Sequence, residues 1–347
     1  MPSAASILKQ EISSRGPISF ARFMEVALYH PEHGYYARAD RASRTGKKGD
    51  FFTSVSVGSL FGRLLARQFE AWWRSDGTPG TFRIVEAGGM DGALAKDVLQ
   101  SATTDFPAFR KAMRYTIVEP LPSLKALQQR TLEGMEGVSW ADSIRNLPPE
   151  AGVVFGNELL DAFPVHLIAR DAKGEWVERS VDVEAEKFVW CESRCDAALH
   201  AGLPANLSGA VEVSPAGASW MGLAAKILKH GRMLFLDYGF SDEEYFQVER
   251  PWGTLRAYRA HQRSEDLLAE PGEQDLTAHV RWTPLLEGAE RDGLKREEWI
   301  QQGRWLGRIF TERPFELSAA EKRQFQTLTH PQMLGHPFRA LVLKKDR

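Results

Sequence analysis

The chain has 347 residues, of which 43% are hydrophobic and 26% charged, a composition typical of a globular protein with one large core or one core and an appended subdomain. The net charge of -2 excludes nucleic acid or an anionic membrane as a partner held by bulk electrostatics, so we expect a small-molecule or protein substrate. The spacing of Cys191 and Cys195 supports neither a disulfide framework nor a zinc site, and no apolar run marks a signal peptide or a membrane span. We therefore expect a cytoplasmic protein.

Residues 1–80 predict a helical N-terminal cap and an active-site loop. Residues 5–29 show the apolar spacing of two short helices interrupted at Gly16-Pro17. A polar, basic segment leads from there to Asp50-Phe51-Phe52-Thr53-Ser54, just ahead of a helix predicted over 58–73. Asp50 and Thr53 are candidates for closing over a cofactor or substrate, and they fit an N-cap cluster equally well.

The strongest sign of a cofactor site lies in residues 82–92. An apolar run over 82–86 predicts a buried strand, which breaks into a glycine-rich turn with Gly88 and Gly92 ahead of a helix-forming segment. Such a turn lets the backbone approach a ligand and aims the N–H groups of the helix start at it. A purely structural turn explains this pattern alone about equally well.

The carboxylates near this turn favour one kind of cofactor. A second strand pattern over 115–119 ends in Glu119, where a ribose-hydroxyl acceptor stands in a strand-helix-strand unit. Glu86 precedes the first glycine, and the pyrophosphate fingerprint of a dinucleotide enzyme is missing. A carboxylate at this place suits the ammonium and sulfonium of S-adenosylmethionine, which we prefer to NAD.

A third strand, predicted over 138–141, would end next to Asp142. Asp142 is a candidate acceptor for the adenine amino group of the cofactor, with Trp140 stacking nearby. A surface aspartate and a core tryptophan explain these two residues equally well.

Two carboxylates follow the strand predicted over 153–156. Asn157-Glu158 comes directly after it, and one helical turn would place Glu158 and Asp161 on the same face. Asn157, Glu158 and Asp161 are therefore our candidates for the catalytic group. The alternative is that Asn157 or Glu158 caps the next helix and that Asp161 is solvated.

The order of the elements predicts an α/β protein. Strand and helix patterns alternate from 81 to 167, as in a doubly wound, mostly parallel sheet, and further buried strands are predicted over 232–238 and 338–343. A period near two, with a hairpin turn at Lys173-Gly174, predicts an antiparallel insertion around 167–215.

One polar cluster raises the question of a metal site. Asp275, Thr277 and His279 alternate along the chain, so they would share one face of a strand. No further ligand pattern accompanies them. We therefore favour structural hydrogen bonding and predict no metal.

Several unusual strings of residues occur in order along nearly the whole chain. They are Tyr29-His30-Pro31-Glu32-His33-Gly34-Tyr35-Tyr36, Gly49-Asp50-Phe51-Phe52-Thr53-Ser54, Phe61-Gly62, Glu86-Ala87-Gly88 with Gly92, Val118-Glu119-Pro120, Asn157-Glu158-Leu159-Leu160-Asp161-Ala162-Phe163-Pro164-Val165-His166, Asp237-Tyr238-Gly239, Gly253-Thr254-Leu255-Arg256-Ala257-Tyr258 and Asp275-Leu276-Thr277-Ala278-His279-Val280. Together they make the sequence resemble the MidA family, bacterial relatives of the mitochondrial complex I assembly factor that is a protein-arginine methyltransferase.

The resemblance implies a Rossmann-like class I methyltransferase fold with S-adenosyl-L-methionine as cofactor. The methyltransferase domain would span 81–347, and the best-known relative implies symmetric dimethylation of an arginine in a protein substrate. Glu86 would then bind the amino group of the cofactor, Gly88 and Gly92 would allow close approach of the backbone, and Glu119 would bind the ribose diol. Asn157, Glu158 and Asp161 would face the acceptor.

Two departures from the family pattern keep other functions open. Met90 stands where another glycine is usual, and Val55-Ser56 stands where a Pro-Glu pair is common. If position 90 needs a positive φ, Met90 carries a strain of about 1 kcal/mol or more. The alternatives are a non-catalytic assembly protein, a small-molecule methyltransferase and, remotely, a dehydrogenase. The sequence identifies neither the protein substrate nor the oligomeric state, and it leaves a homodimer open.

Overall fold

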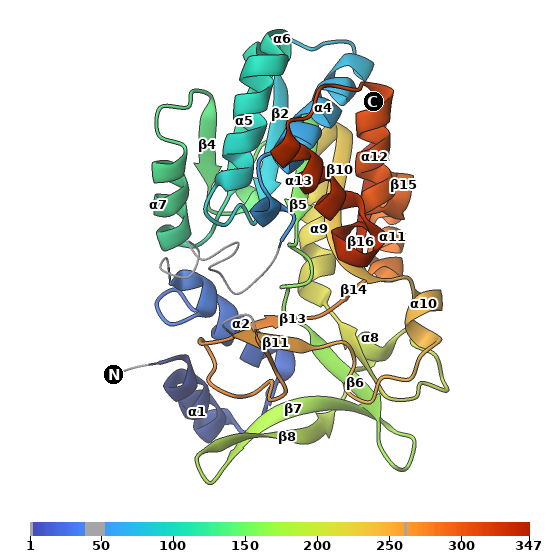
Figure 1. Cartoon of the computed structure of the whole chain (residues 1–347). Coiled ribbons are helices and arrows are strands. Elements are labelled where there is room, and N and C mark those ends of the chain that lie inside the picture. The colour runs from blue at the N-terminus through green and yellow to red at the C-terminus, as the bar shows by residue number, and fades with distance from the viewer. Residues whose placement is uncertain (1–2, 39–52, 260–261) are drawn as a thin grey trace. The chain divides into compact units, whose positions relative to one another are not determined.

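The computed structural model describes residues 3–38, 53–259 and 262–347, and Figure 1 labels its elements. Contacts within the chain define two compact units, each assembled from three segments. Unit 1 comprises Met1–Arg41, Asp161–Ser219 and Phe240–Leu285, and unit 2 comprises Ala42–Leu160, Trp220–Gly239 and Leu286–Arg347. The boundary that the sequence suggested at residue 80 stays a prediction.

Unit 2 is built on a mostly parallel sheet with the strand order β15-β16-β10-β5-β2-β3-β4. Neighbours from β10 to β4 run parallel, and β16 runs antiparallel to both β10 and β15. Every strand that the sequence predicted for this sheet is present, with ends shifted by a few residues. The strands are β2 (Phe82–Ala87), β3 (Met113–Val118), β4 (Val138–Ala141), β5 (Glu150–Asn157), β10 (Leu228–Phe240), β15 (Lys295–Gln301) and β16 (Phe338–Lys345).

Helices cover both faces of this sheet. One face contributes Ile84, Phe155 and Leu236 to a core that apolar residues of α4, α5, α12 and α13 complete. On the other face, the Trp220 ring of α9 meets the Phe235 ring of β10 edge-on at 6.0 Å between centroids. The predicted doubly wound α/β class is confirmed. The helices and short turns are η2 (Val55–Val57), α4 (Leu60–Ser75), α5 (Ala93–Asp105), α6 (Pro107–Ala112), α7 (Pro122–Thr131), η3 (Ile144–Asn146), α9 (Pro215–Ile227), α11 (Trp282–Arg291), α12 (Gln302–Glu312), α13 (Ala319–Thr329) and η4 (Pro331–Gly335).

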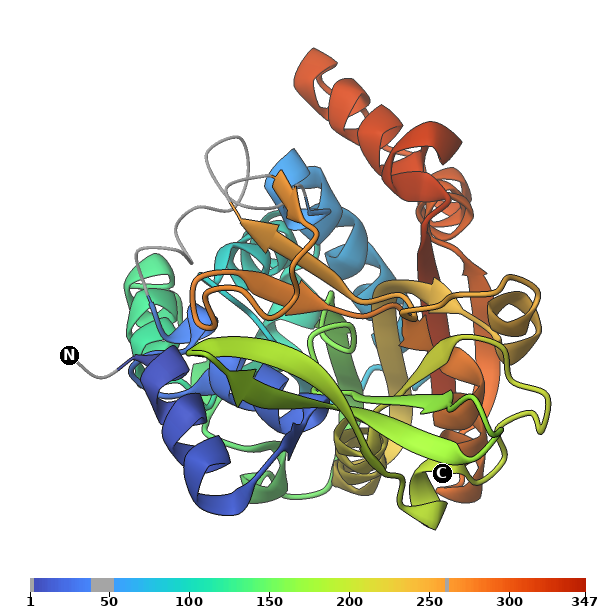
Figure 2. The ribbon, with the colours of Figure 1, turned by 90° about the horizontal axis from the view of Figure 1, so that it is seen from below.

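Unit 1 contains two antiparallel sheets, which Figure 2 shows from below, mostly in green and in orange. The first has the order β1-β7-β6-β9, with β8 paired to β7, and the second has the order β12-β11-β13. The antiparallel insertion predicted around 167–215, with its hairpin turn at Lys173-Gly174, is confirmed. The strands of these two sheets are β1 (Ile18–Ser19), β6 (His166–Arg170), β7 (Trp176–Glu184), β8 (Lys187–Arg194), β9 (Ala210–Val213), β11 (Arg256–Arg259), β12 (Gln262–Ser264) and β13 (Asp275–Thr277), and the short strand β14 (Val280–Arg281) belongs to neither sheet.

The two predicted N-terminal helices are present and pack within unit 1. Phe20 of α2 lies 5.1 Å from the Trp190 ring of β8, and Phe23 lies 5.4 Å from the Phe188 ring of the same strand, between ring centroids. The apolar face of α2 is thus covered by the antiparallel insertion, which explains why both belong to one unit. The helices are α1 (Ala4–Arg15), α2 (Phe20–Tyr29), η1 (Tyr35–Ala37), α8 (Ala197–His200) and α10 (Asp242–Phe246). In the described part of the chain, none of the helices has the length and apolar character needed to cross a membrane.

Close contact between β5 and β2 gives a test of stability. Gly152 has φ +149°, and a Cβ atom there would lie 1.9 Å from the Arg83 carbonyl oxygen. Because that obstacle is backbone, we expect Gly152→Ala to lower the free energy of unfolding by about 2–4 kcal/mol in urea titrations. Gly80→Ala, whose Cβ would meet nothing within 4 Å, is the control and should change it by less than about 0.5 kcal/mol. Equal stability of the two variants would contradict this account.

Candidate functional site

The carboxyl ends of β2, β3 and β5 lie level at one edge of the sheet of unit 2, and β10 passes this level at Leu236 and continues to Phe240. Ala87 of β2 pairs with Val118 of β3 and with Gly156 of β5, and Asn157 of β5 pairs with Leu236 of β10. The residues that follow these positions therefore meet at the edge where open α/β sheets bind their ligands. They are Gly88, Glu119, Glu158 and Asp237.

The turn between β2 and α5 follows a backbone path that glycine favours. Gly88, Met90 and Gly92 have φ values of +72°, +43° and +81°. The Gly92 N–H donates to the Gly89 carbonyl oxygen at 2.7 Å, and α5 starts directly after Gly92. The positive φ considered for Met90 is confirmed, so this residue carries a strain of about 1 kcal/mol or more.

Glu86 lies next to this turn with its side chain buried. Burial raises the pKa of Glu86 to about 7, although the Tyr115 hydroxyl, which donates to Glu86 Oε2 at 2.8 Å, opposes the shift. A Cβ atom on Gly89 would come within 3.4 Å of the same oxygen. Gly89 therefore keeps the space beside the carboxylate open.

A buried glutamine that the sequence analysis missed holds Glu119. Glu119 Oε1 accepts from the Leu121 N–H at 2.9 Å, and Oε2 accepts from Gln128 Nε2 at 3.0 Å. Gln128 also donates to the Met90 carbonyl oxygen and accepts from Trp140 Nε1, each at 3.0 Å. One amide on α7 thus ties together the glycine turn, Glu119 and β4. Burial raises the pKa of Glu119 to about 7.

Asp142 and Trp140 lie at the end of β4, as the sequence predicted. Asp142 is exposed and pairs with Lys125, with 2.8 Å between Oδ1 and Nζ. Trp140 is partly buried, and its indole N–H is bound by Gln128. The role of Asp142 at the adenine amino group stays a prediction.

The helical turn expected after β5 is absent, and this part of the prediction is wrong. Residues 158–165 form an irregular loop in which Glu158 has φ +50°. The N–H groups of Leu159 and Leu160 donate to Asp237 Oδ2 at 3.1 and 2.8 Å, so a side chain of β10 satisfies them in place of helical carbonyl groups. Helical spacing therefore does not relate Glu158 to Asp161.

Glu158 is instead fixed by contacts at the sheet edge. Its Oε1 accepts from the Ser54 N–H at 3.3 Å and from Asn157 Nδ2 at 3.1 Å. Ser54 is buried and donates through Oγ to Gln302 Oε1 at 3.2 Å. Asn157 Oδ1 is buried and has no hydrogen-bond partner among the residues that the structure describes. A carboxylate and an amide oxygen thus stand together where a cationic group could bind.

Thr53 and Ser56 exchange hydrogen bonds at a short turn. Thr53 N donates to Ser56 Oγ at 2.9 Å, and Ser56 N donates to Thr53 Oγ1 at 3.1 Å, around η2. The helix predicted over 58–73 begins at Leu60, whose N–H donates to Gln324 Oε1 at 3.1 Å. The N-cap residues are Ser54 for η2 and Ser59 for α4, so Thr53 is the N-cap residue of neither helix.

The remaining predicted residues lie elsewhere. Asp50 is outside the described residues. Asp161 belongs to unit 1, where its carbonyl oxygen accepts from the Ala278 N–H at 2.9 Å. Asp275, considered for a metal site, accepts from the Tyr36 hydroxyl at 2.8 Å. Within residues 3–38, 53–259 and 262–347, no group of three or more His, Cys, Asp or Glu side chains is placed to hold a metal ion.

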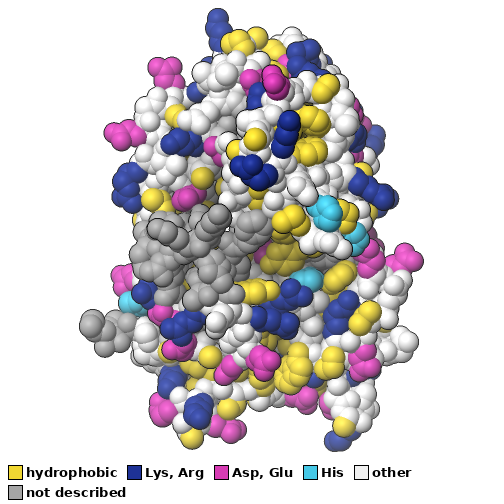
Figure 3. Space-filling model, viewed as in Figure 1, with side chains coloured by type: hydrophobic (Ala, Val, Ile, Leu, Met, Phe, Trp, Pro, Cys, Tyr) yellow, Lys and Arg dark blue, Asp and Glu magenta, His cyan; other side chains and the backbone are white. Residues whose placement is uncertain are grey.

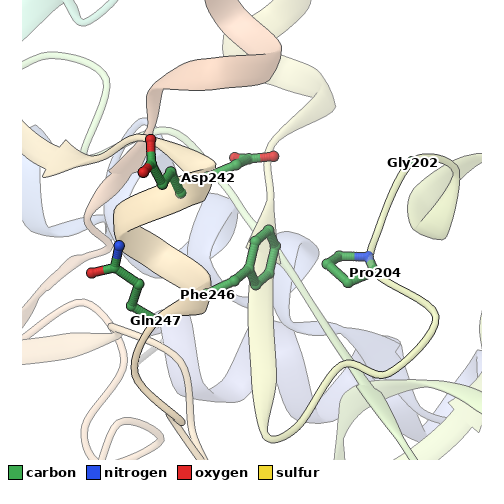
Figure 4. Close-up of a pocket in the computed structure, with 6 residues that line it drawn as sticks. Gly202, Pro204, Asp242, Phe246 and Gln247 are labelled. Carbon is green, nitrogen blue, oxygen red and sulfur yellow. The ribbon is translucent and has the colours of Figure 1, made fainter.

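The surface of unit 1 is hollowed beside α10. Figure 4 shows this hollow, in which Phe246 of α10 faces Pro204 and acidic side chains lie at the opposite end of the same helix. Asp242 there is paired with Arg281, with 2.7 Å between Oδ2 and Nη2. The hollow gathers no group of side chains suited to methyl transfer.

Comparison with known proteins identifies the class to which this fold and site belong. A family model described as "Putative S-adenosyl-L-methionine-dependent methyltransferase" matches residues 64–300, and the chain belongs to that family. A similar crystal structure is that of a likely methyltransferase from Burkholderia thailandensis with S-adenosyl-homocysteine bound, which is 30% identical in sequence. The superposition has a TM-score of 0.86 and covers 99% of this chain and 92% of that one. The expected class I methyltransferase fold, the resemblance to the MidA family and the cofactor S-adenosyl-L-methionine are thereby confirmed.

Curated relatives extend the similarity to mitochondrial proteins. The mitochondrial protein arginine methyltransferase NDUFAF7 homolog of Drosophila melanogaster is 28% identical over 98% of this chain and 84% of its own length. The mitochondrial protein arginine methyltransferase NDUFAF7 of Mus musculus is 30% identical over 82% of this chain and 69% of its own length.

The groups at the sheet edge of unit 2 fit this cofactor. Gly89 leaves open the space that a Cβ atom would fill beside the Glu86 carboxylate, which suits an ammonium group. Glu119 can accept from ribose hydroxyls with the lone pairs that Leu121 and Gln128 leave unused. The residues present thus supply both the backbone approach and the acceptors that the cofactor needs.

The buried amide on α7 gives the second test. Gln128→Leu leaves the Met90 carbonyl, the Trp140 N–H and one Glu119 oxygen without their partner. We expect it to lower the free energy of unfolding by about 2–4 kcal/mol and to weaken S-adenosyl-homocysteine binding about tenfold in calorimetry. Gln129→Leu, on the neighbouring exposed position, is the control and should leave both quantities unchanged. Equal behaviour of the two variants would refute the role given to Gln128.

The raised pKa of Glu86 predicts a pH dependence. Below a pH of about 7 its carboxylate is protonated and loses its attraction for an ammonium group, so affinity for S-adenosyl-homocysteine should fall by up to about tenfold per pH unit. Glu86→Gln should bind more weakly at pH 8 and show a shallower slope in calorimetric titrations. If affinity depended on pH as steeply in Glu86→Gln as in the unmodified protein, Glu86 would not be the residue that binds the ammonium group.

The raised pKa values of Glu86 and Glu119 also predict how stability depends on pH: stability should fall as the pH rises, whereas affinity for the ligand should increase. Between pH of about 4.5 and 7 the folded form holds protons on Glu86 and Glu119 that the unfolded chain releases. The free energy of unfolding of the ligand-free protein should therefore decrease as the pH rises through this window.

Proposed function

We propose that this methyltransferase transfers methyl groups to arginine side chains of a protein substrate. The observation that supports this most directly is the position of Glu158, a carboxylate at the end of β5 with φ +50°. A non-glycine residue in this region costs about 1–3 kcal/mol and persists only when its surroundings enforce it. The names of the Drosophila and mouse relatives support the same acceptor.

The chemistry of the acceptor explains why a fixed carboxylate is useful. The guanidinium group is protonated at any working pH, so the enzyme must orient it and accept a proton from it. S-adenosyl-L-methionine, when bound, supplies an electrophilic methyl group. Glu158 would accept charge-assisted hydrogen bonds from the guanidinium, and Asn157 Oδ1 would add an uncharged acceptor. Asp161 remains a predicted second carboxylate.

The loop that carries Glu158 is packed directly on the glycine turn. A Cβ atom on Gly88 would lie 3.1 Å from Leu159 Cδ1, and one on Gly156 would lie 2.6 Å from Leu159 Cδ2. Leu159 therefore rests on the bare backbone of both glycines. This contact couples the position of Glu158 to that of the turn, which methyl transfer requires because the reacting atoms must be held in line.

Local groups, and not a uniform field, would recognise a protein substrate. On the face shown in Figure 3, Lys and Arg side chains are interspersed with Asp and Glu side chains. With a net charge of -2, a surface of this kind does not steer a partner strongly at long range.

The strained Met90 supports a second candidate, a non-catalytic assembly protein that keeps the fold. A long side chain at φ +43° stands in the turn that we expect to face the cofactor. Calorimetry separates the two functions, because the second candidate requires that neither S-adenosyl-L-methionine nor S-adenosyl-homocysteine binds.

Glu158→Gln tests the proposal. The variant keeps the size and most hydrogen bonds of the side chain but loses its charge, so we expect transfer to fall at least about tenfold while S-adenosyl-homocysteine affinity stays within about twofold. The assay incubates purified protein with S-adenosyl-L-methionine and an extract of host cells lacking it, and mass spectrometry counts methylated arginines. Asp161→Asn is assayed in the same way.

Three results would contradict the proposal. Full transfer by Glu158→Gln would remove this residue from the acceptor site. Methylation confined to small molecules of the extract would exclude a protein substrate, and methylation of protein residues other than arginine would exclude the acceptor.

A further inference from the structure

Unit 1 contains a second hollow, which the methyltransferase chemistry does not use. It has a volume of ≈ 290 Å³, and Arg250, Arg256, Arg263 and His279 are among the residues that line it. Of the described residues lining this hollow, none is acidic. Three arginine residues around one small space are unusual, because like charges placed close together repel one another.

The pairing of β11 and β12 brings two of these arginines to one face. Arg256 and Tyr258 are two residues apart on β11, so their side chains point to the same face of the strand. Tyr258 pairs directly with Arg263 of β12. Since side chains of directly paired residues point to the same face, Arg256 and Arg263 project from the same side of the sheet. Arg259 projects from the opposite side and forms an ion pair with Glu270.

The arginines of the hollow are not neutralised by the part of the chain that the structure describes. Arg250 donates to the carbonyl oxygens of Tyr245 and Val248, the latter at 2.9 Å. Arg256 donates to the Tyr258 hydroxyl at 3.4 Å. Neither these two nor Arg263 makes an ion pair with a described carboxylate.

Glu212 contacts three residues that line the hollow, Gly253, Thr254 and Leu255, and its carboxylate is bound by other groups. Glu212 is buried and accepts from the N–H groups of Thr254 and Leu255, the latter at 3.1 Å, and from the Tyr245 hydroxyl at 2.5 Å. A Cβ atom on Gly253, at φ +66°, would clash with Glu212 Oε1 at 2.2 Å. Glu212 therefore fixes the turn that leads into β11, and with it the position of Arg256.

His279 adds no charge to the hollow at working pH. Burial foremost, and then Arg256 and Arg250, lower its pKa to about 3. Its ring lies 5.0 Å from the Phe240 ring, between centroids, and the backbone N–H of His279 donates to Thr254 Oγ1 at 2.9 Å. His279 is therefore an uncharged residue beside the arginines that line the hollow.

We propose that this hollow binds an oxyanion, a carboxylate or phosphate group, carried by a polypeptide. Guanidinium groups present N–H donors in a fork that matches the two or three oxygens of such a group, and Arg256 and Arg263 approach it from one sheet face. That the polypeptide is the methyl acceptor rests on the function proposed above. The hollow would then select substrates that carry an acidic or phosphorylated side chain.

Binding of labelled peptides tests the proposal without any methyl transfer. Three fluorescein-labelled peptides share one sequence and differ at one central position, which holds glutamate, phosphoserine or glutamine. Fluorescence anisotropy measures their Kd for the full chain, for the double variant Arg256→Gln/Arg263→Gln and for the control Arg259→Gln. Circular dichroism checks that the variants are folded, and S-adenosyl-homocysteine titration checks that unit 2 is intact.

We expect the glutamate or phosphoserine peptide to bind the unmodified chain and Arg259→Gln at least about tenfold more tightly than the glutamine peptide. The double variant should lose that preference, and added salt should weaken it. Preference for glutamate identifies a carboxylate, and preference for phosphoserine identifies a phosphate group.

Equal binding of all three peptides, or an unchanged preference in the double variant, would overturn the proposed oxyanion site. Either result would leave the methyltransferase proposal intact if transfer to protein arginine is observed. Conversely, peptide binding without arginine methylation would refute only the proposed function.

Discussion

The level register of β2, β3, β5 and β10 is the constraint on which the site of unit 2 depends. Gly152 pairs with both Arg83 and Gly231, and at each of these contacts a Cβ atom would collide with backbone, so the three strands approach closely at that level. A slip by one residue would turn Glu86 to the opposite face of the sheet, away from Tyr115. The glycine turn, Glu119 and the Glu158 loop can meet only because β2, β3 and β5 end at the same level.

Much of this arrangement could be predicted, because its signals are local. Apolar runs identify the buried strands, and the glycine spacing after Glu86 identifies a turn with positive φ, including the strain at Met90. The sequence did not predict the role of Gln128. This residue follows Leu121 and Leu124 at helical spacing, and a polar side chain on such an apolar face needs a hydrogen-bond partner. Its partners lie on β3, β4 and the glycine turn, and a single helix pattern does not reveal them.

Errors arose where residues distant in the sequence decide the local conformation. The spacing of Glu158 and Asp161 suggested a helical turn, but Asp237, nearly eighty residues further along, binds the N–H groups that a helix would have used. The amphipathic pattern of α2 likewise predicted a buried face without naming its cover. Phe188 and Trp190 of the insertion supply that cover, so the N-terminal helices belong to unit 1.

The two recognition sites proposed above suit opposite charges, and each unit contains one of them. In unit 2 the Glu158 carboxylate and the Asn157 amide oxygen suit a cationic side chain, and in unit 1 Arg256 and Arg263 suit an anionic one. One ion pair alone distinguishes substrates poorly, because an isolated exposed ion pair contributes only about 0–1 kcal/mol to the free energy of binding. A second recognised charge adds discrimination, because a polypeptide that lacks it leaves charges of the enzyme uncompensated. Selectivity of this kind needs no large apolar interface, and it accords with a chain whose own charges nearly balance.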